Sequence, residues 1–347
     1  MNLQEQFKDK KVFITGSTGF KGSWLSFLLT KLGAVVKSIG LPNGDRNTAF
    51  NQLHIKDISD VTYFDLRNRI PSWLQHDLLN SDYVFHFAAQ AIVSEGYANP
   101  KYTFDTNIGG TINLLEEIKY SDKEIKFLSV ASDRVYAPTE GNYSHKEEDP
   151  LGGCYDPYSV SKVIQNQLVD SYRRLPDLSD KVTLINARTS NVIGGGDRGK
   201  NRLMTSIQDA YEHNKPVELR NPSFSRQYIY VLDCLCSYLY IIAKGTQDAY
   251  NIGAGDKTIC TVQELVDECK KYYTGLKSTN TGKQFGFEGS ALSVNTERFH
   301  NEFTEVQTHI AKNIEEIIKR TLKYNLADNK VDYASQLVEE ALRVYSI

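Results

Sequence analysis

The sequence has few of the residues from which metal sites and disulfide frameworks are built. Its 347 residues include five cysteines, which are scattered, odd in number and never spaced Cys-x-x-Cys. Its seven histidines form no His-x-x-x-His pair. We therefore predict no metal site and no structural disulfide, and the expected location is a reducing cytoplasm.

Long apolar runs and a surplus of one charge are also lacking. The longest apolar run, residues 24–36, is interrupted by Lys31 and is too short to cross a bilayer. Residues 1–11 are polar and lack the apolar core of a signal peptide. The formal net charge is −3 and no basic block offsets it, which argues against a nucleic-acid surface. We expect neither a membrane nor a nucleic acid among the partners of this protein.

What the sequence does contain is an alternation of short β-branched runs with amphipathic helical stretches. This alternation is typical of a parallel sheet that helices cover on both faces. The predicted strands cover residues 11–15, 34–39, 61–65, 83–87, 125–131 and 182–187. The predicted helices between them cover residues 20–32, 70–79, 102–119 and 157–174. The predicted fold class is therefore α/β, a Rossmann-type doubly wound parallel sheet.

The rhythm of strands and helices breaks after about Arg188, where we expect a smaller, mainly helical lobe that binds the substrate. Helices are predicted over residues 202–213, 232–244, 262–273, 310–324 and 333–344, and a surface loop over residues 275–289. A chain of this length is expected to form two lobes rather than one. The first would cover residues 1–190 and take in about 228–255, and the second would cover residues 191–227 and 256–347.

A glycine-rich turn follows the first predicted strand and opens the first helix. Gly16, Gly19 and Gly22 give it a G-x-x-G-x-x-G spacing. Such glycines let backbone N–H groups approach a pyrophosphate, which a helix N-terminus also attracts. A turn without a ligand is the alternative, but the position between strand and helix favours a dinucleotide site. Residues 37–42 offer no acid for the ribose hydroxyls, so these residues leave the choice between NAD and NADP open.

Further contacts with the dinucleotide are expected at the ends of later strands. Asp65 and Leu66 follow the third strand, where they would flank the adenine. Ala88 and Ala89 follow the fourth, where small residues would pack on the cofactor, with close packing against protein as the alternative. The predicted cofactor-binding residues are Gly16, Thr18, Gly19, Phe20, Lys21, Gly22, Asp65, Leu66, Ala88, Ala89, Gln90, Asn107, Tyr158 and Lys162.

A tyrosine and a lysine four residues apart form the candidate redox pair. Tyr158 and Lys162 lie on one face of the helix predicted over residues 157–174. A nearby ammonium would lower the pKa of the tyrosine from its usual value near 10, so that it accepts a proton from a hydroxyl. A solvated surface pair is the alternative, but the order of phosphate loop, strand and pair favours catalysis. Ser132 would bond to the reacting hydroxyl, and Asp133 follows the strand end where ligands of such sheets bind, although it could instead be a cap or turn residue.

These residues together resemble the extended short-chain dehydrogenase/reductase family. The stretch G-F-K-G-S-W-L-S at residues 19–26 is similar to a signature of CDP-glucose 4,6-dehydratases, and N-V-I-G-G-G-D at residues 191–197 resembles a second one. Arg220-Asn221-Pro222 matches as well, and the resemblance runs from about residue 10 to residue 233. It implies a CDP-linked hexose as substrate, NAD as cofactor and a three-step reaction. The hexose is oxidised at C4, water is lost across C5 and C6, and the hydride returns to C6.

The resemblance also implies roles for individual residues. Asp133 would protonate the departing C6 hydroxyl, and a homodimer or higher homo-oligomer is expected, with the helices at residues 102–119 and 157–174 at its interface. Packing of those helices inside one subunit is the alternative. The predicted substrate-binding residues are Asn191, Gly195, Arg202, Arg226 and Tyr228, with the two arginines on the diphosphate. The predicted catalytic residues are Ser132, Asp133, Arg134, Tyr158 and Lys162.

The sequence departs from the resembled family where the C5 proton has to be removed. The family's Thr-Asp-Lys is here Ser132, Asp133 and Arg134. A guanidinium stays protonated and cannot act as a base, although it can stabilise an enolate. The resemblance leads us to predict a CDP-hexose 4,6-dehydratase. Because Arg134 cannot act as a base, the alternative is a nucleotide-sugar C4 epimerase or oxidoreductase that loses no water. A non-catalytic Rossmann binding protein is the second alternative.

Overall fold

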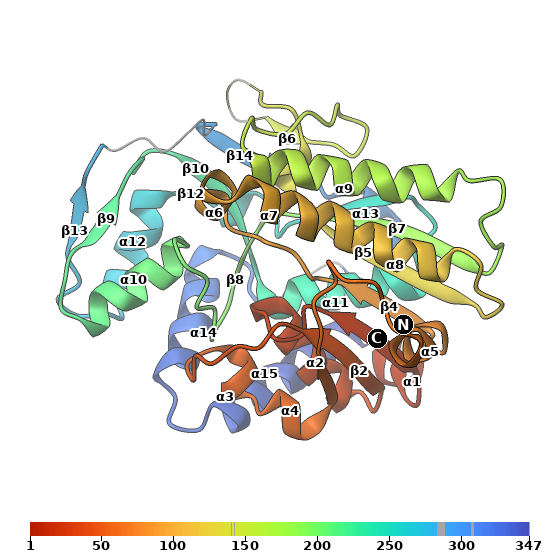
Figure 1. The fold of residues 1–347 in the computed structure, drawn as a ribbon. Coiled ribbons are helices and arrows are strands. Elements are labelled where there is room, and N and C mark those ends of the chain that lie inside the picture. The colour runs from red at the N-terminus through yellow and green to blue at the C-terminus, as the bar shows by residue number, and fades with distance from the viewer. Residues whose placement is uncertain (140, 142, 283–288, 307–308, 347) are drawn as a thin grey trace.

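The computed structural model describes residues 1–139, 141, 143–282, 289–306 and 309–346. Its main sheet, within these residues, has seven strands in the order β11-β7-β5-β4-β1-β2-β3, all parallel (Figure 1). The strands are β1 (Lys11–Thr15), β2 (Val35–Gly40), β3 (Asp60–Tyr63), β4 (Tyr83–His86), β5 (Ile125–Ser132), β7 (Val182–Thr189) and β11 (Ala249–Ile252). The predicted Rossmann-type sheet is thereby confirmed.

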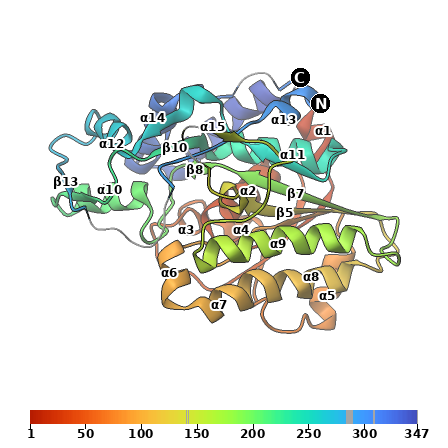
Figure 2. The same cartoon turned by 90° about the horizontal axis from the view of Figure 1, so that it is seen from above.

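Helices cover both faces of the main sheet, as Figures 1 and 2 show. The helices of one face are α5 (Ser72–Leu79), α7 (Pro100–Phe104), α8 (Gly110–Ile118) and α9 (Pro157–Arg173). The helices of the other face are α2 (Phe20–Lys31), α11 (Val231–Lys244) and α15 (Lys330–Tyr345). Helix α11 is buried over nearly its whole length because it lies between the sheet and α15. This position explains why its sequence is apolar on all sides.

Two elements of the Rossmann part differ from the prediction. The edge strand β11 was not expected, because Ala249-Tyr250-Asn251-Ile252 is short and contains the fully buried amide Asn251 rather than a continuous apolar run. The helix expected over residues 102–119 instead consists of α7 and α8, joined by a π-helical turn at Asp105–Gly109. Pairing within this part places the carboxyl ends of β5 and β7 side by side, from Ile125 with Val182 to Ser132 with Thr189.

The second lobe is helical as predicted but also contains short strands, which the sequence did not reveal. Its helices are α10 (Leu203–Glu212), α12 (Val262–Lys270) and α14 (Ile314–Leu326). The short strands outside the main sheet are β6 (Ser144–His145), β8 (Asn191–Ile193), β9 (Val217–Leu219), β10 (Ser225–Tyr230), β12 (Ile259–Thr261), β13 (Ser278–Asn280) and β14 (Ala291–Val294). All of these strands except β10 have only two to four residues, which carry too little periodicity to be recognised in a sequence.

The loop predicted over residues 275–289 is wrong in part. Its first half contains β13, which pairs in parallel with β9, while residues 283–288 lie outside the described residues. The remaining helices are α1 (Leu3–Phe7), α3 (Ala49–Gln52), α4 (Ile55–Ile58), α6 (Val93–Ala98) and α13 (Glu297–Glu302). No helix in the described part of the chain has both the length and the apolar character to span a membrane.

Candidate active site

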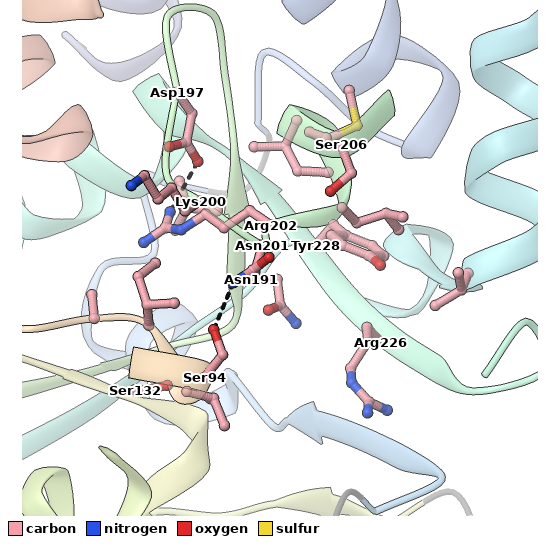
Figure 3. A pocket seen from close by; sticks show the side chains of 18 of the residues that line it. Ser94, Ser132, Asn191, Asp197, Lys200, Asn201, Arg202, Ser206, Arg226 and Tyr228 are labelled. Atoms are coloured by element: carbon pink, nitrogen blue, oxygen red, sulfur yellow. Dashed lines mark hydrogen bonds and ion pairs between the residues drawn. The ribbon is translucent and has the colours of Figure 1, made fainter. Parts of the chain in front are cut away.

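A cavity of about 920 Å³ opens where β5 and β7 end. Its wall takes in Val130, Ala131, Ser132 and Asp133 from the end of β5 and Thr189 from the end of β7. The carboxyl ends of strands in an open parallel sheet are where such folds bind ligands. The second lobe supplies the opposite wall, from β8, β9, β10 and α10, so that the cavity lies between the two parts of the fold (Figure 3).

The glycine turn has the close backbone approaches that a dinucleotide site needs. Gly16 adopts a φ of +76°, and a Cβ at this position would lie 2.7 Å from the backbone nitrogen of Ala88. A Cβ at Gly22 would lie 2.3 Å from the carbonyl oxygen of Gly16. Gly19 is the N-cap of α2 and has no side chain to cover the first N–H groups of the helix. The turn therefore fits a diphosphate at the N-terminus of α2.

The expected adenine contacts lie away from the cavity, near the outer strands. Asp65 accepts hydrogen bonds from the backbone and side chain of Arg67, and these bonds lower the pKa of its carboxyl. Leu66 is buried against Gly110 at the start of α8. Thr18 contacts Gly40, where a Cβ would lie 2.6 Å from the threonine hydroxyl. The structure thus places Asp65 after β3 as predicted, with Arg67 as an unforeseen partner.

Gln90 and Asn107 are buried and bonded to one another. The amide oxygen of Asn107 accepts from the backbone nitrogen of Gln90 at 2.7 Å, and its amide nitrogen donates to the hydroxyl of Ser161 at 2.8 Å. Neither residue is part of the cavity wall, whereas Ala89 is. Their geometry supports a positioning role, because they tie the end of β4 to the helix that carries Tyr158 and Lys162.

Lys21, which belongs to the glycine turn, lies in the cavity wall. Its ammonium lies 5.8 Å from the ring centre of Phe87 and donates to the hydroxyl of Tyr238 at 3.3 Å. Burial lowers the pKa of this lysine. The other large side chain of the turn, Phe20, contacts the position of Gly194.

Tyr158 and Lys162 both face the cavity, as the spacing of four residues predicts. Tyr158 is 8% exposed and forms a hydrogen bond with Ser132. The ammonium of Lys162 donates to the carbonyl oxygen of Val130 at 3.1 Å and to the side chain of Gln165 at 2.7 Å. Burial, with a smaller effect of the ammonium of Lys21, lowers the pKa of Lys162 to about 7.

The pKa of Tyr158 differs from the expectation. Burial raises the pKa of its phenol above 10, and the hydrogen bond with Ser132 opposes this rise only in part. The ammonium of Lys162 is bonded to Val130 and Gln165 instead of the phenol. Desolvation of the phenolate therefore outweighs the stabilisation that a nearby ammonium was expected to provide.

Asp133 is a buried carboxyl group in the cavity wall. It begins a short 3₁₀ turn after β5 and is 3% exposed. One oxygen accepts from the hydroxyl of Ser132 at 2.9 Å, while the other, Oδ2, has no hydrogen-bond partner among the described residues. Burial raises the pKa of this carboxyl. A carboxyl group that gives up its proton less readily than a solvated aspartate, and that has one oxygen unsatisfied, is suited to act as an acid toward a bound molecule.

Arg134 lies beside the beginning of the helix that carries the redox pair. Its guanidinium nitrogen Nη1 is 3.9 Å from Oδ2 of Asp156, which is fully buried. Asp156 is the N-cap of α9 and accepts from the backbone nitrogen of Ser159 at 2.9 Å and from its hydroxyl at 2.6 Å. The sequence did not single out Asp156, although an aspartate before proline at a helix start is a recognisable capping pattern.

Four of the five predicted substrate-binding residues line the cavity: Asn191, Arg202, Arg226 and Tyr228. They come from β8, the start of α10 and β10, and Figure 3 shows them gathered around the open space. Arg202 forms an ion pair with Asp197 at 2.9 Å, which raises the pKa of its guanidinium. Asp197 was not predicted, because only the turn after β8 brings it back toward Arg202.

Gly195 is the exception, because it does not line the cavity. A Cβ at this position would lie 2.0 Å from the ring of Tyr324, and its carbonyl oxygen accepts from the indole of Trp24 at 2.9 Å. Its geometry supports close packing of the glycine cluster between α2 and α14. Substrate contact by Gly195 remains a prediction without support from this arrangement.

One contact across the cavity joins residues far apart in the sequence. The side-chain amide of Asn201 donates to the hydroxyl of Ser94 at 2.7 Å (Figure 3). Ser94 belongs to α6 of the Rossmann part, and Asn201 belongs to the turn before α10. Sequence reasoning missed this pair because nothing in either segment marks a bond over 107 positions.

The chain matches a family model and several characterised proteins. Residues 13–326 match the model described as GDP-mannose 4,6 dehydratase. CDP-glucose 4,6-dehydratase of Salmonella typhimurium is 36% identical over 279 residues, which cover 76% of each chain. UDP-glucose 4-epimerase of Mycoplasma genitalium is 26% identical over 332 residues, which cover 89% of this chain and 94% of the epimerase.

Solved structures show the same fold over almost the whole chain. dTDP-glucose 4,6-dehydratase from Bacillus anthracis in complex with NAD superimposes with a TM-score of 0.73 at 21% identity, covering 96% of this chain and 99% of that chain. The NAD-dependent NDP-hexosamine 5,6-dehydratase TunA reaches a TM-score of 0.77 at 19% identity, covering 93% and 99% of the two chains. The chain therefore belongs to the GDP-mannose 4,6-dehydratase family, a group of NAD-dependent enzymes of the extended short-chain dehydrogenase/reductase type.

Proposed function

We propose that the protein is a nucleotide-sugar 4,6-dehydratase that converts CDP-glucose, or a related CDP-hexose, to the 4-keto-6-deoxy sugar. The observation that carries this proposal is Asp133, a buried cavity carboxyl with an unsatisfied oxygen beside the Ser132–Tyr158 pair. Oxidation and reduction alone need no such acid, whereas loss of a hydroxyl as water does. The 36% identity to a CDP-glucose 4,6-dehydratase supports the same choice of substrate.

The cofactor would bind along the glycine turn, held by backbone N–H groups of Gly16 to Gly22 and the N-terminus of α2. NAD supplies a hydride acceptor at the carboxyl end of the sheet and returns the hydride at the end of the reaction. Lys162 lies in the same cavity wall as Tyr158, where its ammonium would donate to the ribose next to the nicotinamide.

Removal of the proton from the sugar's C4 hydroxyl falls to Tyr158, with Ser132 bonded to the same hydroxyl. The two side chains are already hydrogen bonded and both line the cavity. Positive charge from Arg134 and Arg202 lowers the pKa of the phenol and so opposes the effect of burial. A sugar hydroxyl between Ser132 and Tyr158 would thus meet one donor and one proton acceptor.

Departure of the C6 hydroxyl falls to Asp133. Because burial raises the pKa of this carboxyl, the group keeps its proton at higher pH than a solvated aspartate would. Transfer of that proton to the leaving oxygen breaks the C6–O bond and leaves the carboxylate, which Ser132 stabilises by its 2.9 Å hydrogen bond. The carboxylate then takes up a proton, which water can supply, and this restores the acid for the next cycle.

Arg134 favours a second candidate function, a C4 epimerase or oxidoreductase that loses no water. Its guanidinium cannot accept the C5 proton, and at 3.9 Å from the buried carboxylate of Asp156 it is held charged. In the dehydratase, Arg134 would stabilise the enolate that forms when the C5 proton passes to water, and a proton from water would return to C5 when the hydride adds to C6. In the epimerase, it would only bind the sugar. The 26% identity to a UDP-glucose 4-epimerase supports this second candidate.

The test is to incubate the purified protein with NAD and CDP-glucose and to measure the mass of the sugar nucleotide product. Loss of one water supports the dehydratase, and an unchanged mass with inversion at C4 supports the epimerase instead. Tyr158→Phe serves as the control, since it removes the proposed proton acceptor and should yield neither product.

A homodimer, a cytoplasmic location and the expected lobe boundaries remain predictions. A non-catalytic role is disfavoured because Tyr158 and Lys162 lie in one cavity wall.

A further inference from the structure

Ser132, which lies in the cavity wall (Figure 3), is hydrogen bonded to two titratable side chains. Its hydroxyl donates to Oδ1 of Asp133 at 2.9 Å and shares a second hydrogen bond with the phenol of Tyr158. It also accepts from the backbone nitrogen of Arg134 at 3.3 Å. A serine hydroxyl has one proton and two lone pairs, so when it donates to Asp133, the phenol must be the donor in the bond with Tyr158. A chain of hydrogen bonds therefore runs from Tyr158 through Ser132 to Asp133.

The two acidic groups at the ends of this chain depend on the same serine proton. Burial raises the pKa of the Asp133 carboxyl and of the Tyr158 phenol, and a hydrogen bond from Ser132 lowers each of them. Because Ser132 has one proton, it can stabilise only one of the two anions at a time. A state in which both groups are charged is costly, since both charges would be buried and would repel each other. The chain is thus built to hold one negative charge and one proton that either end can carry.

The proposed reaction, on which this inference rests, uses the two ends of the chain in opposite directions. Tyr158 gains the proton of the C4 hydroxyl, while the hydride of C4 passes to NAD and later to C6. Asp133 loses its proton to the C6 oxygen, which leaves as water, and C5 exchanges its proton with water. After one turnover the phenol therefore holds one proton too many and the carboxyl one too few.

We propose that Ser132 passes the surplus proton from Tyr158 to Asp133 after each turnover. The phenol O–H bond breaks as its proton moves to Oγ of Ser132, and the serine proton moves to Oδ1 of Asp133. The products are a phenolate, an unchanged serine hydroxyl and a neutral carboxyl, which are the base and the acid of the next turnover. The step neither gains nor loses a proton. The proton of one C4 hydroxyl thus leaves, one turnover later, in the water formed from a C6 hydroxyl.

The surroundings of the two groups favour this route. Tyr158 is 8% exposed and Asp133 is 3% exposed, so bulk water has little access to either group. Besides burial, the negative charge of Asp133 raises the pKa of the phenol. Transfer of the proton to Asp133 removes that charge and frees Ser132 to donate to the phenolate. The transfer thus lowers the cost of forming the base that accepts the C4 proton.

The experiment compares the first turnover with the steady state in wild type, Ser132→Ala and Ser132→Thr of the full chain loaded with NAD. Excess protein over CDP-glucose gives the rate of the first turnover, excess CDP-glucose gives the steady-state rate, and the mass of the product reports the loss of water. Ser132→Ala should be slow in the first turnover, because it lacks the bond to the C4 hydroxyl, and at least about tenfold slower again in the steady state. Ser132→Thr keeps a hydroxyl and should keep the wild-type ratio of the two rates.

Imidazole distinguishes a proton path from a structural role of Ser132. As a small proton carrier, it should raise the steady-state rate of Ser132→Ala and leave the first turnover of this variant unchanged. The control is Ser237→Ala, which removes a buried hydroxyl of α11 that does not line the cavity and should show no response. Equal slowing of both rates in Ser132→Ala, or no response to imidazole, would overturn the relay and leave the dehydratase standing. A wild type that releases no water from CDP-glucose would instead overturn the proposed function.

Discussion

Replacement of Asp133 by asparagine separates the two halves of the proposed reaction. The asparagine keeps the size of the side chain and can still accept from Ser132, as Asp133 does at 2.9 Å. It cannot deliver a proton to a leaving hydroxyl. We expect C4 oxidation to persist at a rate close to that of wild type, while loss of water slows by about 10²- to 10⁴-fold, the usual contribution of a general acid. This corresponds to about 3 to 5 kcal/mol of transition-state stabilisation.

The stability of the Asp133→Asn variant gives a matched control for folding. Asp133 is 3% exposed and its Oδ2 has no hydrogen-bond partner among the described residues, so the native carboxyl is poorly solvated. A neutral amide costs less to bury than a carboxylate. The free energy of unfolding should therefore stay equal or rise at neutral pH, even as elimination fails.

The assay is a single turnover with excess enzyme, followed by the absorbance of the reduced nicotinamide and by the mass of the sugar. Wild type should show a transient reduced cofactor that disappears as the dehydrated product forms. Asp133→Asn should accumulate the reduced cofactor together with the 4-keto sugar that retains its C6 hydroxyl. Dehydrated product at the wild-type rate would refute the acid role, and a loss of C4 oxidation as large as that of elimination would refute the separation of roles.

Three further predictions follow from the same geometry. Arg134→Lys should speed removal of the C5 proton at alkaline pH, because a lysine can lose its proton where an arginine cannot; exchange of the C5 hydrogen with deuterated water measures this, and unchanged exchange would exclude a base at this position. Tyr158→Phe should lower the rate of cofactor reduction by at least about 10²-fold without weakening nucleotide binding, and a variant that still turns over would show that another group accepts the C4 proton. His86 is buried between two threonine hydroxyls at 2.8 Å each, and burial lowers its pKa to about 3. As the pH falls below about 6.5, the histidine takes up a proton in the unfolded chain but not in the folded one, so the free energy of unfolding decreases. Between about pH 7 and about pH 5 this decrease amounts to about 2 kcal/mol. Denaturant titration of His86→Gln should show no such decrease.

The sheet and the redox pair could be predicted because their signals are local. The run at residues 125–131 is mostly buried and is apolar except for Lys126 and Ser129, and the step from Tyr158 to Lys162 is one helical turn. The glycine turn was recognisable because Gly16 needs a positive φ and close approach to Ala88. Each of these features lies within a few positions of sequence.

The features that escaped prediction are formed by contacts between distant segments. The bond between Ser94 and Asn201 and the pairing of β9 with β13 leave no pattern in either partner sequence. The rise in the pKa of Tyr158 was missed for a related reason, because the burial that causes it depends on the whole cavity wall. Gly195 was assigned to the substrate from its motif, whereas its surroundings are the ring of Tyr324 and the indole of Trp24.

The central claim is that hydrogen removed from C4 of the sugar is returned to C6. The most direct measurement uses CDP-glucose with deuterium on C4, ordinary water and wild-type protein loaded with NAD, and locates the deuterium in the product by NMR. The proposed reaction places the deuterium in the new methyl group at C6 of a product that has lost one water. Deuterium found again at C4, in a sugar that has kept its C6 hydroxyl, would contradict the dehydratase and support the epimerase.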